Sequence, residues 1–182
     1  MKKRRFLLLL MVLTALLACS CGKKKDDATE AAEEKSSAVK EECIDFVGTK
    51  LPAIAQERNE AIALYNKDFA GGSVDTDQLL TDLKNTAIPK MESYINKLSA
   101  IETTSKEVTD LKVCYMQSAQ KQYDAMKMVV SAVEGENPDY LMQADNLINE
   151  ADTLLAQFDQ MLSETASANG FTVKKASATD AN

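Results

Sequence analysis

Residues 137–170, NPDYLMQADNLINEADTLLAQFDQMLSETASANG, contain both ends and the full repeat of an amphipathic helix. Asn137 can cap the first turn, Pro138 suits the first helical position, and Asp139 places a carboxylate at the positive end of the helix dipole. The closing Asn-Gly pair predicts the helix end. Between these ends the apolar residues recur in steps of three and four, at Leu141, Ala144, Ile148, Ala151, Leu155, Phe158 and Leu162.

Three preceding segments show the same spacing and predict three more helices. The first covers about residues 37–69, with a face of Val39, Cys43, Val47, Leu51, Ile54, Ala61, Ile62, Tyr65 and Phe69. The second starts after Asp75, which with Gln78 makes a cap pair, and its face is Leu79, Leu83, Ile88, Met91, Ile95 and Leu98. The third starts at Thr104 in a capping box with Glu107, and its face is Val108, Leu111, Tyr115, Ser118, Met126, Val129 and Val133.

Four amphipathic helices joined by short connections bury their apolar faces most simply as an up-down-up-down four-helix bundle. We therefore predict an all-α fold. Pro52 and Pro89 interrupt the first and second helices, and each removes a backbone hydrogen bond, so kinks or short interruptions are expected there. A three-helix core, with the first or second helix broken at its proline, is the alternative. The bundle is expected to occupy residues 37–170, between a flexible acidic tether at 19–36 and a disordered tail at 171–182.

The N-terminal residues 1–18 have the three parts of an export signal. Four basic residues at positions 2–5 precede a thirteen-residue apolar run from Phe6 to Ala18, which is short of the roughly 20 residues that span a membrane. The run ends in Leu16-Leu17-Ala18-Cys19, which resembles the lipobox of bacterial lipoproteins. The resemblance implies that Cys19 is acylated, becomes the new N-terminus and anchors the protein by lipid.

Two other interpretations of this segment stay open: acylation of Cys21, and an ordinary secretory signal with an incidental cysteine. The lipobox resemblance implies an extracytoplasmic protein. In a Gram-negative cell Ser20 after the cysteine implies the outer membrane. In a Gram-positive cell the residue after the cysteine carries no such information, and the lipid anchor implies the outer face of the cell membrane.

Charge and composition argue against several classes of function. The chain has a formal charge of −7, and loss of the four basic residues of the signal takes it to −11. An acidic protein repels nucleic acid, so no nucleic-acid partner is expected. The chain also has no histidine, the commonest metal ligand and general base. We expect no metal, no cofactor and no enzymatic activity.

Three polar residues are expected at one level in the middle of the bundle. Counting from the connections places Arg58 on the face of the first helix level with Gln122 on the third and Glu150 beside the face of the fourth. A buried charge needs a partner, so Arg58 is expected to pair with Glu150 and to bond Gln122. The layer is either a small-ligand pocket or a structural device that sets the helix register, and Arg58 can also extend to water.

Two cysteines lie in the helical region, Cys43 on the first helix and Cys114 on the third. A disulfide between them and two buried free thiols are both compatible with the sequence, because diagonal helices would hold the pair too far apart to bond. We also expect four methionines to pack in the core or at its boundary, namely Met126, Met128, Met142 and Met161.

Two hypotheses of function follow. The first is a non-catalytic envelope protein that is held on a membrane by its lipid and binds another protein, in a scaffold, accessory or immunity-type role. The second is a small-ligand-binding bundle that uses the layer around Arg58.

Overall fold

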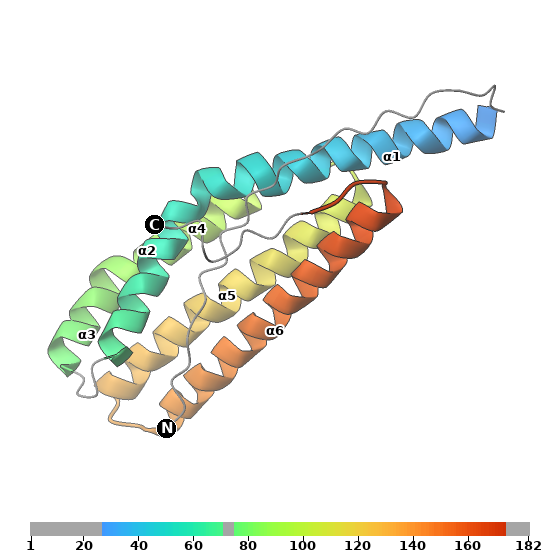
Figure 1. The fold of residues 1–182 in the computed structure, drawn as a ribbon. Helices are drawn as coiled ribbons and strands as arrows, with labels where there is room; N and C mark the ends of the chain where they lie inside the picture. The colour runs from blue at the N-terminus through green and yellow to red at the C-terminus, as the bar shows by residue number, and fades with distance from the viewer. Residues whose placement is uncertain (1–26, 71–74, 174–182) are drawn as a thin grey trace.

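The computed structural model describes residues 27–70 and 75–173, and every regular element in those two ranges is helical (Figure 1). This confirms the predicted all-α class. The first helical run comprises α1 (Asp27–Asp45), the π-helical turn η1 (Phe46–Lys50) and α2 (Leu51–Ala70). The second comprises α3 (Thr76–Asp82), the π-helical turn η2 (Leu83–Ala87) and α4 (Ile88–Ser99). The last two runs are α5 (Lys106–Glu134) and α6 (Asp139–Ala168).

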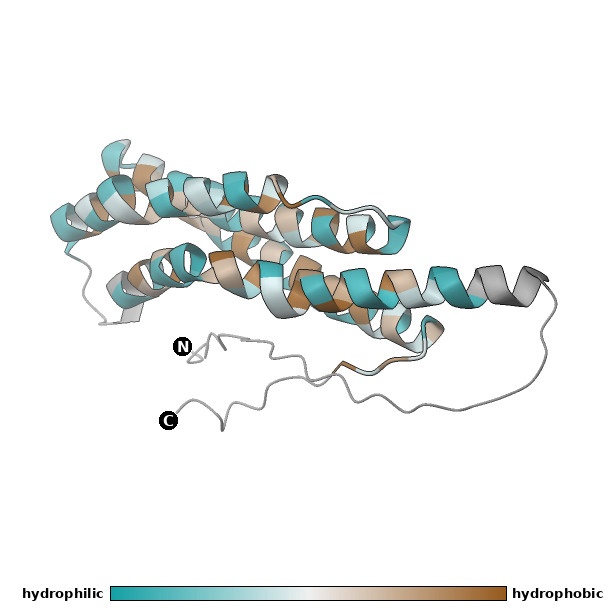
Figure 2. Cartoon of the chain, turned by 90° about the horizontal axis from the view of Figure 1, so that it is seen from above, coloured by the Kyte–Doolittle hydropathy of each residue, from teal (hydrophilic) through white to brown (hydrophobic). Residues whose placement is uncertain are grey.

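The long helices α5 and α6 lie side by side and form the most extensive helix pair of the fold (Figure 1). On the other side of the molecule α4 contacts both α2 and α5. Apolar residues lie on the sides of the helices that face one another, and polar residues cover the outside (Figure 2). The N-terminal part of α1 extends beyond the ends of α5 and α6 (Figure 1).

A π-helical turn precedes each of the two interior prolines. In η1 and η2 the hydrogen bonds reach back five residues, from Leu51 N–H to the Phe46 carbonyl and from Ile88 N–H to the Leu83 carbonyl. Pro52 and Pro89 follow directly after these donors. A proline lacks an N–H and clashes with the carbonyl four residues back, and a π turn widens the helix at that place.

Two buried aromatic residues lie beside the predicted faces and were not part of them. Phe46 adjoins Val47, which is buried as predicted, and Tyr94 adjoins Ile95, which is only partly buried. Position 94 and position 95 both fit steps of three and four between Met91 and Leu98, so the apolar pattern alone does not select Tyr94.

The buried residues otherwise follow the predicted faces, with two exceptions in the first turn of α6. Leu141 is 42% exposed and Met142 is 62% exposed, so the prediction that these side chains pack inward is wrong. The other three methionines agree with the prediction, because Met126 is buried and Met128 and Met161 pack against the core.

The side chains predicted to cap the second and fourth helices accept backbone hydrogen bonds, but the Gln78 side chain donates to Asp82 and does not complete the expected pair with Asp75. The Asp75 side chain accepts hydrogen bonds from the backbone N–H groups of Asp77 and Gln78, each 3.1 Å away. The Asn137 side chain accepts from Asp139 N–H at 3.0 Å. At its other end α6 closes in a Schellman motif around Gly170, whose φ of +67° lies in the region that favours glycine.

The start of α5 differs from the expected capping box at Thr104. The side chain of Ser105 is the N-cap and accepts from Val108 N–H at 3.3 Å. The N–H groups of Thr104 and Ser105 instead donate to the carboxylate of Glu42 on α1. A long-range contact therefore satisfies the backbone donors that the local motif was expected to satisfy.

Helical structure starts before residue 37, and the chain contacts the core beyond residue 170. Helix α1 begins at Asp27, inside the expected tether, because its alanines, glutamates and lysines are good helix formers. After Gly170 the chain continues in contact with the core, and Phe171 and Val173 are partly buried there. The remaining residues of the expected tether and tail lie outside the described residues.

Candidate functional site: a polar layer between the helices

The structure brings together two of the three residues of the expected polar layer. The Nε–H of Arg58 on α2 donates to Oε1 of Gln122 on α5 at 3.0 Å. Gln122 is only 1% exposed, whereas Arg58 is partly buried. The side-chain nitrogen Nε2 of Gln122 is buried and has no hydrogen-bond partner among the described residues. The amide group of Gln122 therefore uses its oxygen as an acceptor, while its two N–H donors have no partner among the described residues.

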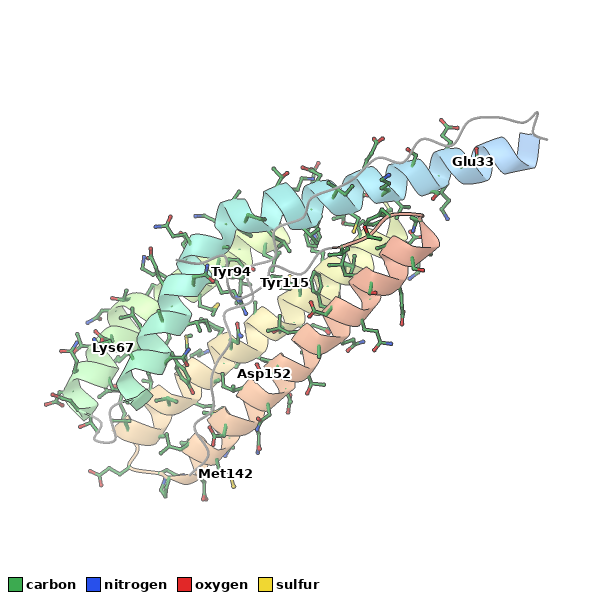
Figure 3. All side chains as sticks on the ribbon, in the orientation of Figure 1. Glu33, Lys67, Tyr94, Tyr115, Met142 and Asp152 are labelled. Atoms are coloured by element: carbon green, nitrogen blue, oxygen red, sulfur yellow. The ribbon has the colours of Figure 1, made fainter. Side chains whose placement is uncertain are left out.

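Aromatic rings surround this pair. The guanidinium carbon of Arg58 lies 5.7 Å from the centre of the Tyr115 ring, a distance that allows a cation–π interaction. The Tyr115 ring lies 4.9 Å from that of Phe158 on α6. Tyr94 on α4 lies near Tyr115 (Figure 3) and is almost fully buried. Burial raises the pKa of Tyr94, and the neighbouring Tyr115 adds to this effect while Arg58 opposes it.

Glu57, next to Arg58 in the sequence, points to α4 instead of α5. Its Oε1 accepts from Ser93 Oγ at 3.1 Å and from Lys97 Nζ at 2.8 Å. The bond from Lys97 lowers the pKa of this carboxyl group, with a smaller contribution from Ser93. Its other oxygen, Oε2, is buried without a partner among the described residues. Sequence periodicity did not predict this contact, because Glu57 is not one of the apolar residues that define the buried face of α2.

Glu150 does not join the layer, and the expected Arg58–Glu150 pair is replaced by another ion pair. Its carboxylate lies 2.6 Å from Lys121 Nζ, and more than half of its side chain is exposed. The neighbouring Ala151 occupies the buried position, which turns Glu150 toward the outside of the α5–α6 pair. An open groove of about 740 Å³ lies there, lined by Gln117, Lys121, Asn146, Asn149, Glu150, Thr153 and Leu154.

Both cysteines of the helical region are buried free thiols, so the structure contains no disulfide between Cys43 and Cys114. Burial raises the pKa of Cys43 to about 11, and the negative charge of Glu42 adds to this shift. Burial also raises the pKa of Cys114, whose sulfur donates to the Leu154 carbonyl at 3.3 Å. A raised pKa leaves little of the reactive thiolate, so neither group is poised for redox chemistry.

Cys19 and Cys21 lie outside the described residues. Within residues 27–70 and 75–173 no helix is long and apolar enough to cross a membrane. The same residues contain no group of three or more cysteine, aspartate or glutamate side chains placed to hold a metal ion.

Comparison with known protein families identifies a family of lipoproteins. Residues 1–175 match the model of the family described as EMYY-motif containing lipoprotein. No curated protein and no solved structure matches the chain. The matched residues include the predicted export signal and the whole helical region.

Proposed function

The chain belongs to the family of EMYY-motif containing lipoproteins and is a bacterial lipoprotein of the cell envelope, and from this premise we propose that it is a non-catalytic protein that binds another protein. In this proposal residues 1–18 are a cleaved signal peptide and Cys19 carries the acyl chains, such as palmitate. Two or three acyl chains hold a protein firmly on a membrane, because each buried methylene contributes about 0.8 kcal/mol.

The proposal includes an up-down-up-down order of the four helical runs, bent at Pro52 and Pro89. Support comes from α4, which contacts both α2 and α5, and from the extensive contact of α5 with α6. The π turn before each proline is the feature that would accommodate a bend.

One observation carries the proposed binding role: the composition of the α6 surface. The sequence of α6 has six carboxylates and no lysine or arginine over its 30 residues. Such a helix attracts a partner of opposite charge and speeds its association. The carboxylates are Asp139, Asp145, Glu150, Asp152, Asp159 and Glu164.

Two apolar side chains occupy the first turn of this acidic helix. Leu141 and Met142 are, with Val113 on α5, the large apolar residues that are exposed in the described part of the chain. An apolar anchor within a charged rim is typical of protein–protein binding sites. Met142 lies at one end of the molecule and Glu33 on α1 at the other (Figure 3). A lipid at Cys19, upstream of α1, would therefore leave the Leu141–Met142 end facing away from the membrane.

Affinity capture tests this proposal. The lipidated protein is cross-linked in its native envelope, captured and analysed by mass spectrometry beside two variants. We expect one protein partner at near-equal stoichiometry, with a basic surface. The Leu141→Ser/Met142→Ser variant should lose this partner, and the Cys19→Ser variant should lose both the membrane and the partner.

Val113→Ser is the matched control, because it removes an exposed apolar side chain from α5 and should keep the partner. An empty capture from folded wild-type protein would contradict the proposed role. Retention of the partner by the Leu141→Ser/Met142→Ser variant would place the binding surface elsewhere and contradict the assignment to α6.

A further inference from the structure

Gln122 has an unmet hydrogen-bonding requirement in the interior of the protein. Its Oε1 accepts from Arg58, which leaves the two N–H groups of Nε2 pointing away from that bond. Nε2 is buried and without a partner among the described residues. Buried donors in folded proteins nearly always have an acceptor, from protein, water or ligand. An acceptor from outside the described residues would complete this site.

Arg58 shows what kind of acceptor fits. The guanidinium group carries a permanent positive charge and five N–H donors, of which Nε–H is used by Gln122. The carboxylate expected to balance this charge, Glu150, is paired with Lys121. The neighbouring Glu57 is bonded to Lys97. A negatively charged acceptor is therefore favoured over a neutral one.

The planar guanidinium of Arg58 indicates the shape of this acceptor. Arg58 is partly buried, and the centre of the Tyr115 ring lies 5.7 Å from its guanidinium carbon. A planar carboxylate matches the planar fork of a guanidinium through two parallel hydrogen bonds. A carboxylate is therefore the acceptor that the guanidinium fork matches best.

We propose that Arg58 and Gln122 form a binding site for the carboxylate group of a small molecule, with Arg58 neutralising its charge and Nε2 of Gln122 donating to it. This site is on α2 and α5, separate from the protein-binding surface proposed on α6. Binding there would also join the first helical run to the α5–α6 pair.

Nuclear magnetic resonance of the mature lipidated chain in detergent micelles tests the proposal without a variant. The signals followed are the side-chain NH2 of Gln122 and the Nε–H of Arg58, with ¹⁵N labelling. Sodium acetate is the probe, and sodium phosphate and sodium chloride at the same ionic strength are the comparison arms. We expect saturable shifts of both signals with acetate and only small, linear shifts with chloride.

Variants assign the effect to these two residues. Arg58→Met should weaken acetate binding at least tenfold. Gln122→Glu should also weaken acetate binding at least tenfold, because the new carboxylate would pair with Arg58 in place of acetate. The Gln122→Glu variant keeps a partner for Arg58 and so covers the case in which Arg58→Met does not fold. Lys127→Met is the matched control, because Lys127 also lies over a tyrosine ring on α5, at 5.2 Å from the centre of Tyr123.

Three results would overturn the proposal. The absence of a saturable shift would mean that a bound water satisfies Gln122. Equal shifts with acetate and chloride would indicate general ionic screening. Saturation with phosphate alone would contradict a carboxylate as the ligand.

Discussion

The carboxylate of Glu42 on α1 accepts a hydrogen bond from the backbone N–H of Ser105 at the start of α5, 2.8 Å away. The N–H of the preceding residue, Thr104, donates to the same carboxylate. A negative charge thus lies at the positive end of the α5 dipole. This contact joins α1, the helix nearest the proposed lipid anchor, to the start of α5.

Replacement of Glu42 by glutamine should lower the free energy of unfolding by about 1 kcal/mol, the typical value of a helix cap. Burial tends to raise the pKa of Glu42, but the bonds from Ser105 and Thr104 outweigh it and lower the pKa below its ordinary 4.5. The stabilisation is therefore complete above about pH 4.5 and is lost as the pH falls through the folded-state pKa. Denaturant unfolding between pH 7 and pH 3 measures both effects.

The control for this prediction is Glu41→Gln, which changes an exposed neighbouring carboxylate. We expect it to leave stability almost unchanged at pH 7. A Glu42→Gln variant with wild-type stability and the same pH dependence would show that the contact with α5 contributes nothing.

The Arg58–Gln122 bond should be visible in a double-mutant cycle. Arg58→Met leaves the buried Oε1 of Gln122 without a donor, and this should cost about 1–3 kcal/mol. Adding Gln122→Met removes the unsatisfied amide and should restore part of that loss. Urea unfolding of the four proteins gives the coupling energy. A coupling near zero would mean that the two side chains act independently.

The two buried thiols should react slowly in the folded protein. Only the thiolate is alkylated, and burial keeps the pKa of Cys43 near 11. At pH 8 iodoacetamide should label the peptides of Cys43 and Cys114 only after denaturation, as measured by mass spectrometry. Both peptides should be labelled in denaturant without a reductant. A reductant requirement would instead reveal the Cys43–Cys114 disulfide.

Substitution of Gly170 should lower the stability of the protein. Its φ is +67°, and a Cβ atom there would meet no other atom within 4 Å, so the cost comes from the backbone alone. Gly170→Ala should destabilise the protein by about 1 kcal/mol, whereas Gly170→Asn should cost less because asparagine adopts this conformation more readily. Thermal unfolding measures the difference. Equal stability of all three proteins would contradict this account of the α6 end.

The sequence predicted the helices well because their caps and apolar repeats are local. Asp75, Asn137 and Gly170 each act within a few residues of their own position. The cap of α5 was missed because Glu42 comes from another helix, and no local pattern shows such a contact. Tyr94 was missed because positions 94 and 95 fit the helical repeat between Met91 and Leu98 equally well, and only the packing decides between them.

The polar layer was predictable in part. Helix lengths alone placed Arg58 level with Gln122, and the structure joins them. The position of Glu150 depends on how α6 is rotated about its axis, which a count along the chain does not determine. Leu141 looked buried because it continues the repeat of α6, yet it lies in the first turn and is exposed.

Site-specific photo-crosslinking in the native envelope is the most direct test of the proposed protein-binding role. A benzophenone side chain at position 142, in the first turn of α6, is compared with the same group at position 113 on α5. The account predicts one cross-linked protein from position 142 and none from position 113. No cross-link from position 142, or the same products from both positions, would contradict binding through α6.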